Sequence, residues 1–216
     1  MDQFNSEKKI VIAHESSHLW IGQRMMIGND NFDHQWFGEG FNGYICYINL
    51  LNSGIFSEKE FINEANKKIF SPHYSNQYRS LPNDSIAKLY LKDQEVQRLP
   101  YTRGWIYAFY LDNQISFASK GRKSLRDFLQ KLYKFNNKQK KKNSNYNLAL
   151  EDFKKILSEY LPQNQVDFEI GEYMIKGNLI DLSTMYWSKE FNFTSRDDIP
   201  TIFLKKGQHL KNFYSW

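Results

Sequence analysis

The chain has 216 residues, of which 41% are hydrophobic and 17% aromatic, and its formal net charge at pH 7 is +5. This composition is typical of a globular protein and excludes a disordered one, and the length suits one substantial domain or two small lobes that share a cleft. No apolar run approaches the roughly 18 residues that span a bilayer, and no secretory leader opens the chain. The compartment stays open, with the cytoplasm as the default expectation.

The single cysteine, Cys46, excludes an intrachain disulfide and a cysteine-rich zinc site. Any metal must therefore be held by carboxylates and by some of the five histidines. The lysine-rich run at 136–143, "NNKQKKKN", is typical of an exposed, solvated loop. No aromatic residues alternate with these lysines, so neither nucleic acid nor a membrane surface is expected as a partner.

The first third of the chain predicts three helices. Apolar residues recur at helical spacing over 7–27, and a loop rich in Gly, Asn and Asp follows at 28–35. A long apolar and aromatic stretch at 36–54 predicts a buried helix. An amphipathic helix over 57–70 opens with a serine followed three residues later by a glutamate, which is the pattern of a capping box.

The rest of the chain is also predicted to be mainly helical. A long apolar helix over 99–121 has a proline in its first turn and a glycine at its end. Shorter helices are predicted over 84–96, 124–135, 147–161 and 164–177. Alternating residues in 180–194 and 200–206 predict strands. The predicted fold class is mainly α, with minor β near the C-terminus.

The stretch "HESSH" at 14–18 carries the first sign of chemistry. On a helix, His14 and His18 stand one turn apart on the same face, so both can reach one ion at about 2.0–2.1 Å. Glu15 lies about 100° further around the helix. From there it can reach a water beside the ion without being a ligand, which is the position of a general base.

A third ligand decides between a metal site and an ordinary helix surface, because HExxH alone is only moderately specific. Glu39, in "WFGEGF", follows His18 by 21 residues, a spacing at which a second helix can return a carboxylate to the first. A carboxylate in so apolar a context is costly to bury unless it is paired or bound to metal. The sequence therefore predicts one Zn²⁺ held by His14, His18 and Glu39.

"HESSHLW" followed by "WFGEGFNGY" resembles the gluzincin metallopeptidases, and most closely the glycyl aminopeptidase family, whose motifs read HExxHxW and WxxEGF. The resemblance covers roughly residues 8–180. It implies the helical catalytic lobe of a thermolysin-like enzyme, the same three zinc ligands, and Glu15 as the catalytic base.

Further along, "LPYTRG" matches the segment Y-x-[KR]-G of these enzymes and of the related leukotriene-hydrolase-type aminopeptidases. The match implies that the hydroxyl of Tyr101 hydrogen-bonds the developing oxyanion. Without the resemblance, Tyr101 would be an ordinary half-buried aromatic residue at a helix start. Arg103 is expected in a structural salt bridge, and Asp33 and His34 are minor candidates for contact with metal or substrate.

Two departures from the family pattern stand out. Gly43 lies four residues after Glu39, where some gluzincins place an acid that orients a histidine. The upstream β-rich lobe, which supplies a substrate-binding edge strand and recognises the free N-terminus in these enzymes, is expected to be absent or supplied by a partner chain. The predicted domains are a catalytic lobe over 1–180 and a C-terminal extension of uncertain structure over 181–216.

The predicted function is zinc-dependent, aminopeptidase-like hydrolysis of peptide bonds, with a peptide as the partner. The alternative is a truncated or degenerate relative that binds zinc or peptides without cleaving them. A purely structural zinc site is disfavoured, because three protein ligands leave a position open where structural sites are closed by four.

Overall fold

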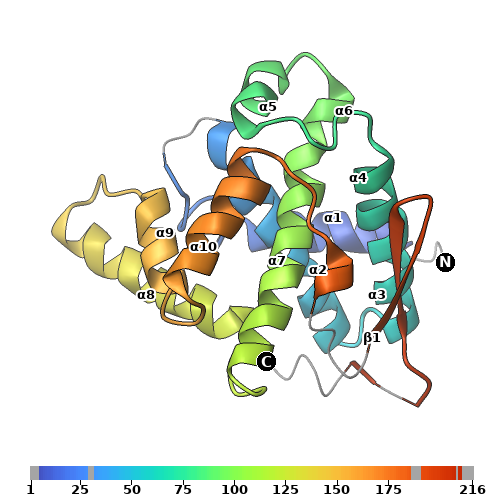
Figure 1. Ribbon diagram of the computed structural model, residues 1–216. Helices are drawn as coiled ribbons and strands as arrows, with labels where there is room; N and C mark the ends of the chain where they lie inside the picture. The colour runs from blue at the N-terminus through green and yellow to red at the C-terminus, as the bar shows by residue number, and fades with distance from the viewer. Residues whose placement is uncertain (1–4, 29–31, 186–190, 208, 211–216) are drawn as a thin grey trace.

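The computed structural model describes residues 5–28, 32–185, 191–207 and 209–210. A long central helix, α7 (Leu99–Ala118), runs through the middle of the molecule, and the other helices are arranged around it (Figure 1). Within the described ranges, no helix is both long enough and apolar enough to span a bilayer. The prediction of a mainly helical fold with minor β near the C-terminus is confirmed.

The other elements follow one another along the chain, with η denoting 3-10 and π-helical segments. They are α1 (Ser6–Ser17), η1 (Phe32–His34), η2 (Trp36–Phe41), α2 (Asn42–Asn52), α3 (Glu58–Ala65), η3 (Asn66–Phe70), α4 (Ser71–Ser75), α5 (Asn83–Leu89), α6 (Gln94–Gln97), α8 (Leu125–Lys142), α9 (Leu150–Leu157), α10 (Gln163–Glu169), η4 (Ile170–Ile175), η5 (Leu182–Thr184), β1 (Phe191–Arg196) and β2 (Ile199–Leu204).

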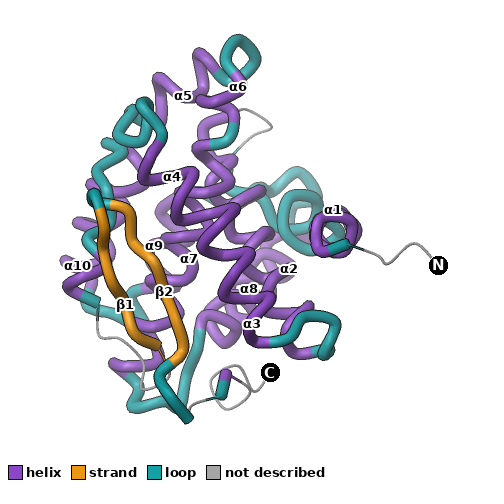
Figure 2. Tube along the Cα trace, turned by 90° about the vertical axis from the view of Figure 1, so that its right-hand side faces the viewer, coloured by secondary structure: helices purple, strands orange, loops and turns teal. Residues whose placement is uncertain are grey.

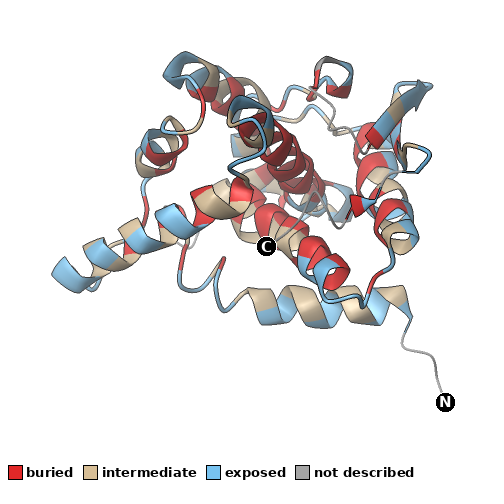
Figure 3. Cartoon of the chain, turned by 90° about the horizontal axis from the view of Figure 1, so that it is seen from below, coloured by how far each residue is buried: buried red, intermediate tan, exposed pale blue. Residues whose placement is uncertain are grey.

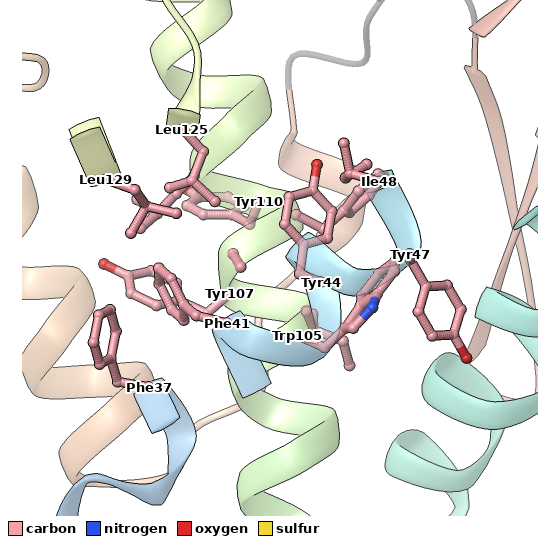
Figure 4. Close-up of a cluster of buried hydrophobic side chains, with 14 of the residues drawn as sticks. Phe37, Phe41, Tyr44, Tyr47, Ile48, Trp105, Tyr107, Tyr110, Leu125 and Leu129 are labelled. Carbon is pink, nitrogen blue, oxygen red and sulfur yellow. The ribbon is translucent and has the colours of Figure 1, made fainter. Parts of the chain in front are cut away.

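Helix α7 is buried along most of its length, because aromatic side chains cover it on several sides. The indole of Trp105 meets the ring of Tyr44 on α2 edge-on, with 5.2 Å between the ring centroids. Figure 4 shows part of this aromatic cluster, in which Phe41 lies beside Tyr107 and Trp105 lies beside Tyr44 and Tyr47. Edge-to-face contacts of this kind add to the stabilisation that burial provides.

The π-helical segment η2 crosses α7 at two glycines. A methyl group added to Gly104 would lie 1.9 Å from the carbonyl oxygen of Trp36, and one added to Gly40 would lie 2.4 Å from the Cα atom of Gly104. Both distances are too short for a side chain, so only glycine allows the two backbones to touch. The crossing fixes the residue next to Gly40, Glu39, against the start of α7, which carries Tyr101.

Helix α1 lies at the edge of the molecule, and none of its residues is fully buried (Figure 3). The side chain of Asn5 caps its start by accepting a hydrogen bond from the backbone N–H of Lys8, 3.0 Å away. The prediction of a helix over 7–27 is wrong beyond Ser17. The residues that follow form turns, and Gly22 among them adopts φ +107°, a conformation that favours glycine and prevents the helix from resuming.

The prediction of an exposed loop at 136–143 is also wrong, because α8 continues through the lysine run to Lys142. Neither glycine nor proline interrupts this segment. Asn136 is fully buried and its side-chain N–H donates to the carbonyl oxygen of Arg24, 2.7 Å away. Lys140 donates to the same carbonyl oxygen at 3.0 Å. These tertiary contacts stabilise the helix, although the lysine-rich composition is typical of a solvated loop.

The other predicted helices are present, several of them divided into shorter segments. The predicted capping box forms at Ser57 and Glu60, and the helix that follows continues as η3 and α4. Within 36–54, η2 and α2 follow one another as far as Asn52, and within 99–121 α7 ends at Ala118.

The only strands among the described residues, β1 and β2, pair antiparallel with each other and lie on the side of the molecule away from α1 (Figure 2). Asp197 and Asp198 join them with φ of 52° and 62°, as a two-residue hairpin turn requires. The strand predicted over 180–194 begins only at Phe191, while residues 182–184 form a 3-10 turn and 186–190 lie outside the described residues. The predicted domain boundary at 180/181 stays a prediction.

Candidate metal centre

Three predicted ligand atoms converge beside α1. The Nε2 atoms of His14 and His18 are 3.1 Å apart. The Oε2 atom of Glu39 lies 3.0 Å from the first and 3.3 Å from the second. All three side chains are partly buried, with 14–18% of each exposed.

These separations suit one zinc ion. In a tetrahedral site with bonds of about 2.0–2.1 Å, the ligand atoms lie about 3.3–3.4 Å from one another. The three observed separations fall at or just below that value, so the side chains need move only a few tenths of an ångström. Two imidazole nitrogens and one carboxylate oxygen are also donor atoms that zinc accepts, and they leave a fourth position free.

The ring of His18 is oriented by a backbone contact at Nδ1, the ring nitrogen that is not a candidate ligand. Its Nδ1 atom lies 3.1 Å from the carbonyl oxygen of Ile21, to which a protonated Nδ1 donates. This hydrogen bond leaves Nε2 unprotonated and able to bind a metal. The turn that provides the carbonyl depends on Gly22, where a side chain would begin 2.8 Å from the imidazole.

His14 is held through its backbone. The side-chain N–H of Asn42, at the start of α2, donates to the carbonyl oxygen of His14 at 3.0 Å. On the Nδ1 side of the ring stands Gly43, where an added Cβ atom would lie 3.9 Å from Nδ1. The acid that some gluzincins place at this position is therefore missing from a point directly beside the ligand.

Glu15 is exposed and lies close to the histidines, because a carboxylate oxygen of Glu15 and ring nitrogens of His14 and His18 lie within 4.8 Å of one another. Glu39 also lies within 3.3 Å of both histidines and is partly buried, so we assign Glu39 as the third candidate ligand. Glu15 instead lines a cavity of about 300 Å³ that also reaches His18 and Glu39. Its carboxylate is thus placed beside the candidate metal position with access to water.

Tyr101 reaches the site from α7. Its ring stacks on the imidazole of His14 with 6.0 Å between centroids. Its hydroxyl interacts with the carboxylate of Glu39 and with the hydroxyl of Tyr90. Burial, followed by the negative charge of Glu39, raises the pKa of Tyr101 and keeps the phenol protonated. Tyr101 lines a second cavity, of about 250 Å³, together with His14 and Glu39.

The family to which these motifs point can be stated from the whole sequence. A sequence model of the Peptidase family M1 domain matches residues 2–160, which is most of the chain. The chain belongs to peptidase family M1. The predicted resemblance to the gluzincin metallopeptidases is confirmed, whereas the match does not test the narrower resemblance to the glycyl aminopeptidases.

Peptidases of family M1 are zinc metallopeptidases, and the donor set built by α1 and η2 fits that metal. The M1 match includes the segments that carry all five predicted site residues. All five lie close together in the structure. His14 and Glu15 are on α1, His18 is at its C-terminal cap, Glu39 is on η2 and Tyr101 is on α7.

Sequence reasoning missed two neighbours of the site. Asn42 lies three residues after Glu39 on a continuous helical path, so its position near α1 follows from helical spacing. Tyr90 belongs to a small separate cluster of apolar side chains, where its ring stacks on Phe32 at 4.4 Å. No local pattern relates Tyr90 to Tyr101, so only the tertiary structure reveals that contact.

His34, a minor candidate, and Arg103, the residue expected in a salt bridge, have different surroundings. His34 lines the cavity that Glu15 also lines, and burial lowers its pKa. Arg103 is buried and donates to the carbonyl oxygens of Arg79 and Leu81, at 3.1 and 2.8 Å. These carbonyls take the place of the expected salt bridge, so Arg103 ties the loop before α5 to the central helix.

Proposed function

We propose that the chain hydrolyses peptide bonds with one zinc ion held by His14, His18 and Glu39, with Glu15 as the general base. The observation that carries the proposal is the convergence of three ligand atoms, each within 3.3 Å of the other two, beside an exposed carboxylate on the same helix. Membership of peptidase family M1 supports the same reaction.

Zinc in this site would supply a Lewis acid and lower the pKa of water. Glu15 accepts a proton from the attacking water and passes it to the nitrogen of the leaving amine. The hydroxyl of Tyr101 donates a hydrogen bond to the carbonyl oxygen of the substrate as negative charge develops there. A phenol suits this role, because its ordinary pKa of about 10 keeps it protonated at neutral pH.

The two cavities beside the ligands suggest how a peptide would lie. Glu39 lines both of them, with Glu15 in one and Tyr101 in the other. The base and the oxyanion donor therefore approach the candidate metal position from two sides, as addition of water to a carbonyl requires. We infer that the peptide crosses Glu39 from one cavity to the other and that the action is aminopeptidase-like.

The test combines zinc analysis with peptide hydrolysis on the purified chain. We expect close to one zinc per chain, little zinc in His18→Ala, and hydrolysis of unblocked fluorogenic peptides by the wild type. Glu15→Gln should keep the zinc and lose roughly 10²–10⁴-fold in kcat, because general base catalysis contributes that much. A fully active Glu15→Gln protein would refute the proposed role of Glu15.

A second candidate function is binding of zinc and peptide without cleavage. It is favoured by the position of the hairpin, since no residue of β1 or β2 lines either cavity beside the ligands. A peptide is often held by adding to the edge of a sheet, and among the described residues no strand offers that edge at the site. Stoichiometric zinc with no hydrolysis of any tested peptide would favour this candidate, and folded protein that binds no zinc would refute both.

A further inference from the structure

A third cavity, of about 680 Å³, extends the candidate site beyond Tyr101. Its walls come from η3 and α4 on one side and from α6 and the start of α7 on the other (Figure 1). It shares Lys68, Ile69 and Tyr101 with the cavity of about 250 Å³ that His14 and Glu39 also line. The two cavities therefore meet at these side chains and form one path away from the candidate metal position.

The lining of the third cavity includes an accessible cation, Arg98. Arg98 precedes Tyr101 by three residues along the helical path from α6 into α7, so the two side chains stand on the same face. Both are exposed, Tyr101 to 37%. Within the part of the chain that the structure describes, no hydrogen bond or ion pair engages the guanidinium of Arg98. This guanidinium is free to bind an anionic group in the cavity.

The other charged groups of the lining leave that preference in place. Glu95, the one acidic residue in the described lining, accepts a hydrogen bond from the side-chain N–H of Gln77 at 3.2 Å and makes no ion pair with Arg98. Lys68 adds a second cation, and its partner at 3.5 Å, Glu7, lines only the smaller cavity. A carboxylate in the third cavity would therefore be attracted, and a guanidinium can bind it through two N–H groups at once.

The part of the peptide that reaches this cavity follows from the proposed function, on which the inference rests. An aminopeptidase-like enzyme removes one residue, so only the leaving part of the peptide extends further from the cleaved bond. Arg98 lies about 4.5 Å along the helix axis from Tyr101, which contacts the carbonyl of that bond. An extended peptide advances about 3.3–3.6 Å per residue, so this distance corresponds to one to two residues beyond the carbonyl.

We propose that Arg98 is a specificity-determining residue. It binds a carboxylate on the second residue after the cleaved bond, which is either an acidic side chain or the C-terminus of a tripeptide.

The first experiment measures peptide binding without cleavage, by fluorescence anisotropy with zinc-loaded Glu15→Gln protein at low ionic strength. The probes are Ala-Ala-Asp-Ala-Lys and Ala-Ala-Asn-Ala-Lys, each with a neutral dye on the lysine and an amidated C-terminus. We expect the Asp peptide to bind up to about fivefold more tightly, which is the upper end for an exposed ion pair, and added salt to remove the difference.

Two unlabelled competitors distinguish the sources of the carboxylate. They are Ala-Ala-Ala with a free C-terminus and the amide of the same tripeptide. Tighter binding of the free acid alone assigns the subsite to a C-terminus, whereas a preference for the Asp peptide alone assigns it to a side chain. Equal binding within both pairs would overturn the proposal.

The second experiment locates the subsite with matched variants in the Glu15→Gln protein. Arg98→Gln should abolish the preference for Asp over Asn, and Arg98→Glu should reverse it. Arg122→Glu makes the same change in net charge beyond the other end of α7, on a residue outside the lining, and should keep the preference. An equal loss in Arg98→Glu and Arg122→Glu would mean that the peptide responds only to overall charge, which would refute this location.

The corresponding substrates separate this inference from the proposed function. In the protein with Glu15 intact, the ratio of kcat/KM for the Asp and Asn peptides should match the ratio of their affinities. Hydrolysis of both peptides at equal kcat/KM would refute the role of Arg98 and leave the proposed function in place. A preference in binding that depends on Arg98, with no hydrolysis of either peptide, would refute the proposed function and leave the subsite in place.

Discussion

The two halves of the candidate site are held in different ways. Glu39 and Tyr101 lie on η2 and α7, whose backbones touch at Gly40 and Gly104 in the core. The two histidines and Glu15 belong to α1 and its C-terminal cap, and no residue of that helix is fully buried. A few directional contacts, such as that from Asn42 to the carbonyl of His14, tie α1 to the rest of the molecule.

We infer from this difference that Glu39 and Tyr101 are held rigidly, whereas the two histidines and Glu15 are held more loosely. Close packing leaves the carboxylate and the phenol little freedom, since interiors are as dense as organic crystals. Helix α1 buries little apolar surface, and local opening of such elements costs less free energy than global unfolding. We therefore expect the position of the histidines, rather than that of Glu39, to depend on a bound metal.

The largest loss of stability is expected where η2 crosses α7. Gly104→Ala would place a methyl group 1.9 Å from the carbonyl oxygen of Trp36, so η2 and α7 must move apart. We expect a loss of at least about 3 kcal/mol in the free energy of unfolding, measured by urea denaturation, because overpacking against backbone cannot be relieved by a rotamer change.

Gly171→Ala is the control for that variant. Gly171 lies in the helical segment η4, and an added methyl group meets no atom within 4 Å. This variant should gain about 0.5–1 kcal/mol, as replacement of glycine by alanine in a helix usually does. If Gly104→Ala proves as stable as the wild type, the two halves of the site do not differ in rigidity.

The buried half should also respond to acid through His73. This side chain is buried, its Nδ1 atom lies 2.9 Å from the hydroxyl of Thr102, and burial, followed by the charges of Arg103 and Arg79, lowers its pKa to about 3. The unfolded chain, with a histidine pKa of about 6.5, then binds more protons than the folded chain between these values.

Stability should therefore fall as the pH is lowered through this window, by up to about 1.4 kcal/mol for each pH unit from this group. Urea denaturation between pH 7 and 4.5 would measure the slope. His73→Gln keeps a polar side chain and cannot titrate, so its slope should be shallower, whatever its stability at pH 7. An unchanged slope would show that His73 is not buried in its neutral form.

Helix α1 should open locally more easily than α7, and zinc should reduce that difference. In hydrogen exchange without metal, the amides of α1 should open with a smaller free energy than those of α7. Zinc at 100 times its dissociation constant should raise the protection of α1 by up to about 2.7 kcal/mol, since it binds only the closed form. His18→Ala should show no such gain. Equal protection of α1 and α7 without zinc would contradict the comparison.

The sequence predicts most of the site because its residues are carried by short, local patterns. Helical spacing predicts that His14 and His18 bind the same ion. The position of Glu39 in an apolar segment predicts that its carboxylate is paired or bound to metal. Tyr101 follows only from the family resemblance, because a tyrosine at a helix start is common in cores.

Other features could not be predicted, since they depend on contacts between distant segments. The glycines at 40 and 104 are explained only when η2 and α7 are seen to cross. The lysine run is helical because Asn136 and Lys140 bind the carbonyl of Arg24, more than 100 residues away. Conversely, the helix predicted over 7–27 ends at Ser17, and Gly22 in the turn that follows takes a positive φ that composition does not reveal.

The smallest effect is expected on zinc affinity, from a substitution at Gly43. It tests how firmly His14, in the loosely held half of the site, is oriented. An aspartate there would begin 3.9 Å from Nδ1 of His14 and in ordinary contact with Trp105, so there is room for its carboxylate. A carboxylate that accepts a hydrogen bond from Nδ1 orients a metal-binding histidine and raises its basicity. Gly43→Asp should therefore bind zinc about tenfold more tightly, as measured by competition with a chelator.

Gly43→Ala separates this effect from that of helix stability. Both variants replace a glycine within α2, so both should gain stability from the loss of glycine, by about 0.5–1 kcal/mol for alanine. Only the aspartate can hold the imidazole, so only it should change zinc affinity. If alanine tightens zinc binding as much as aspartate does, the affinity is limited by how firmly α2 supports α1. In that case the orientation of the His14 ring is already fixed without an acid at position 43.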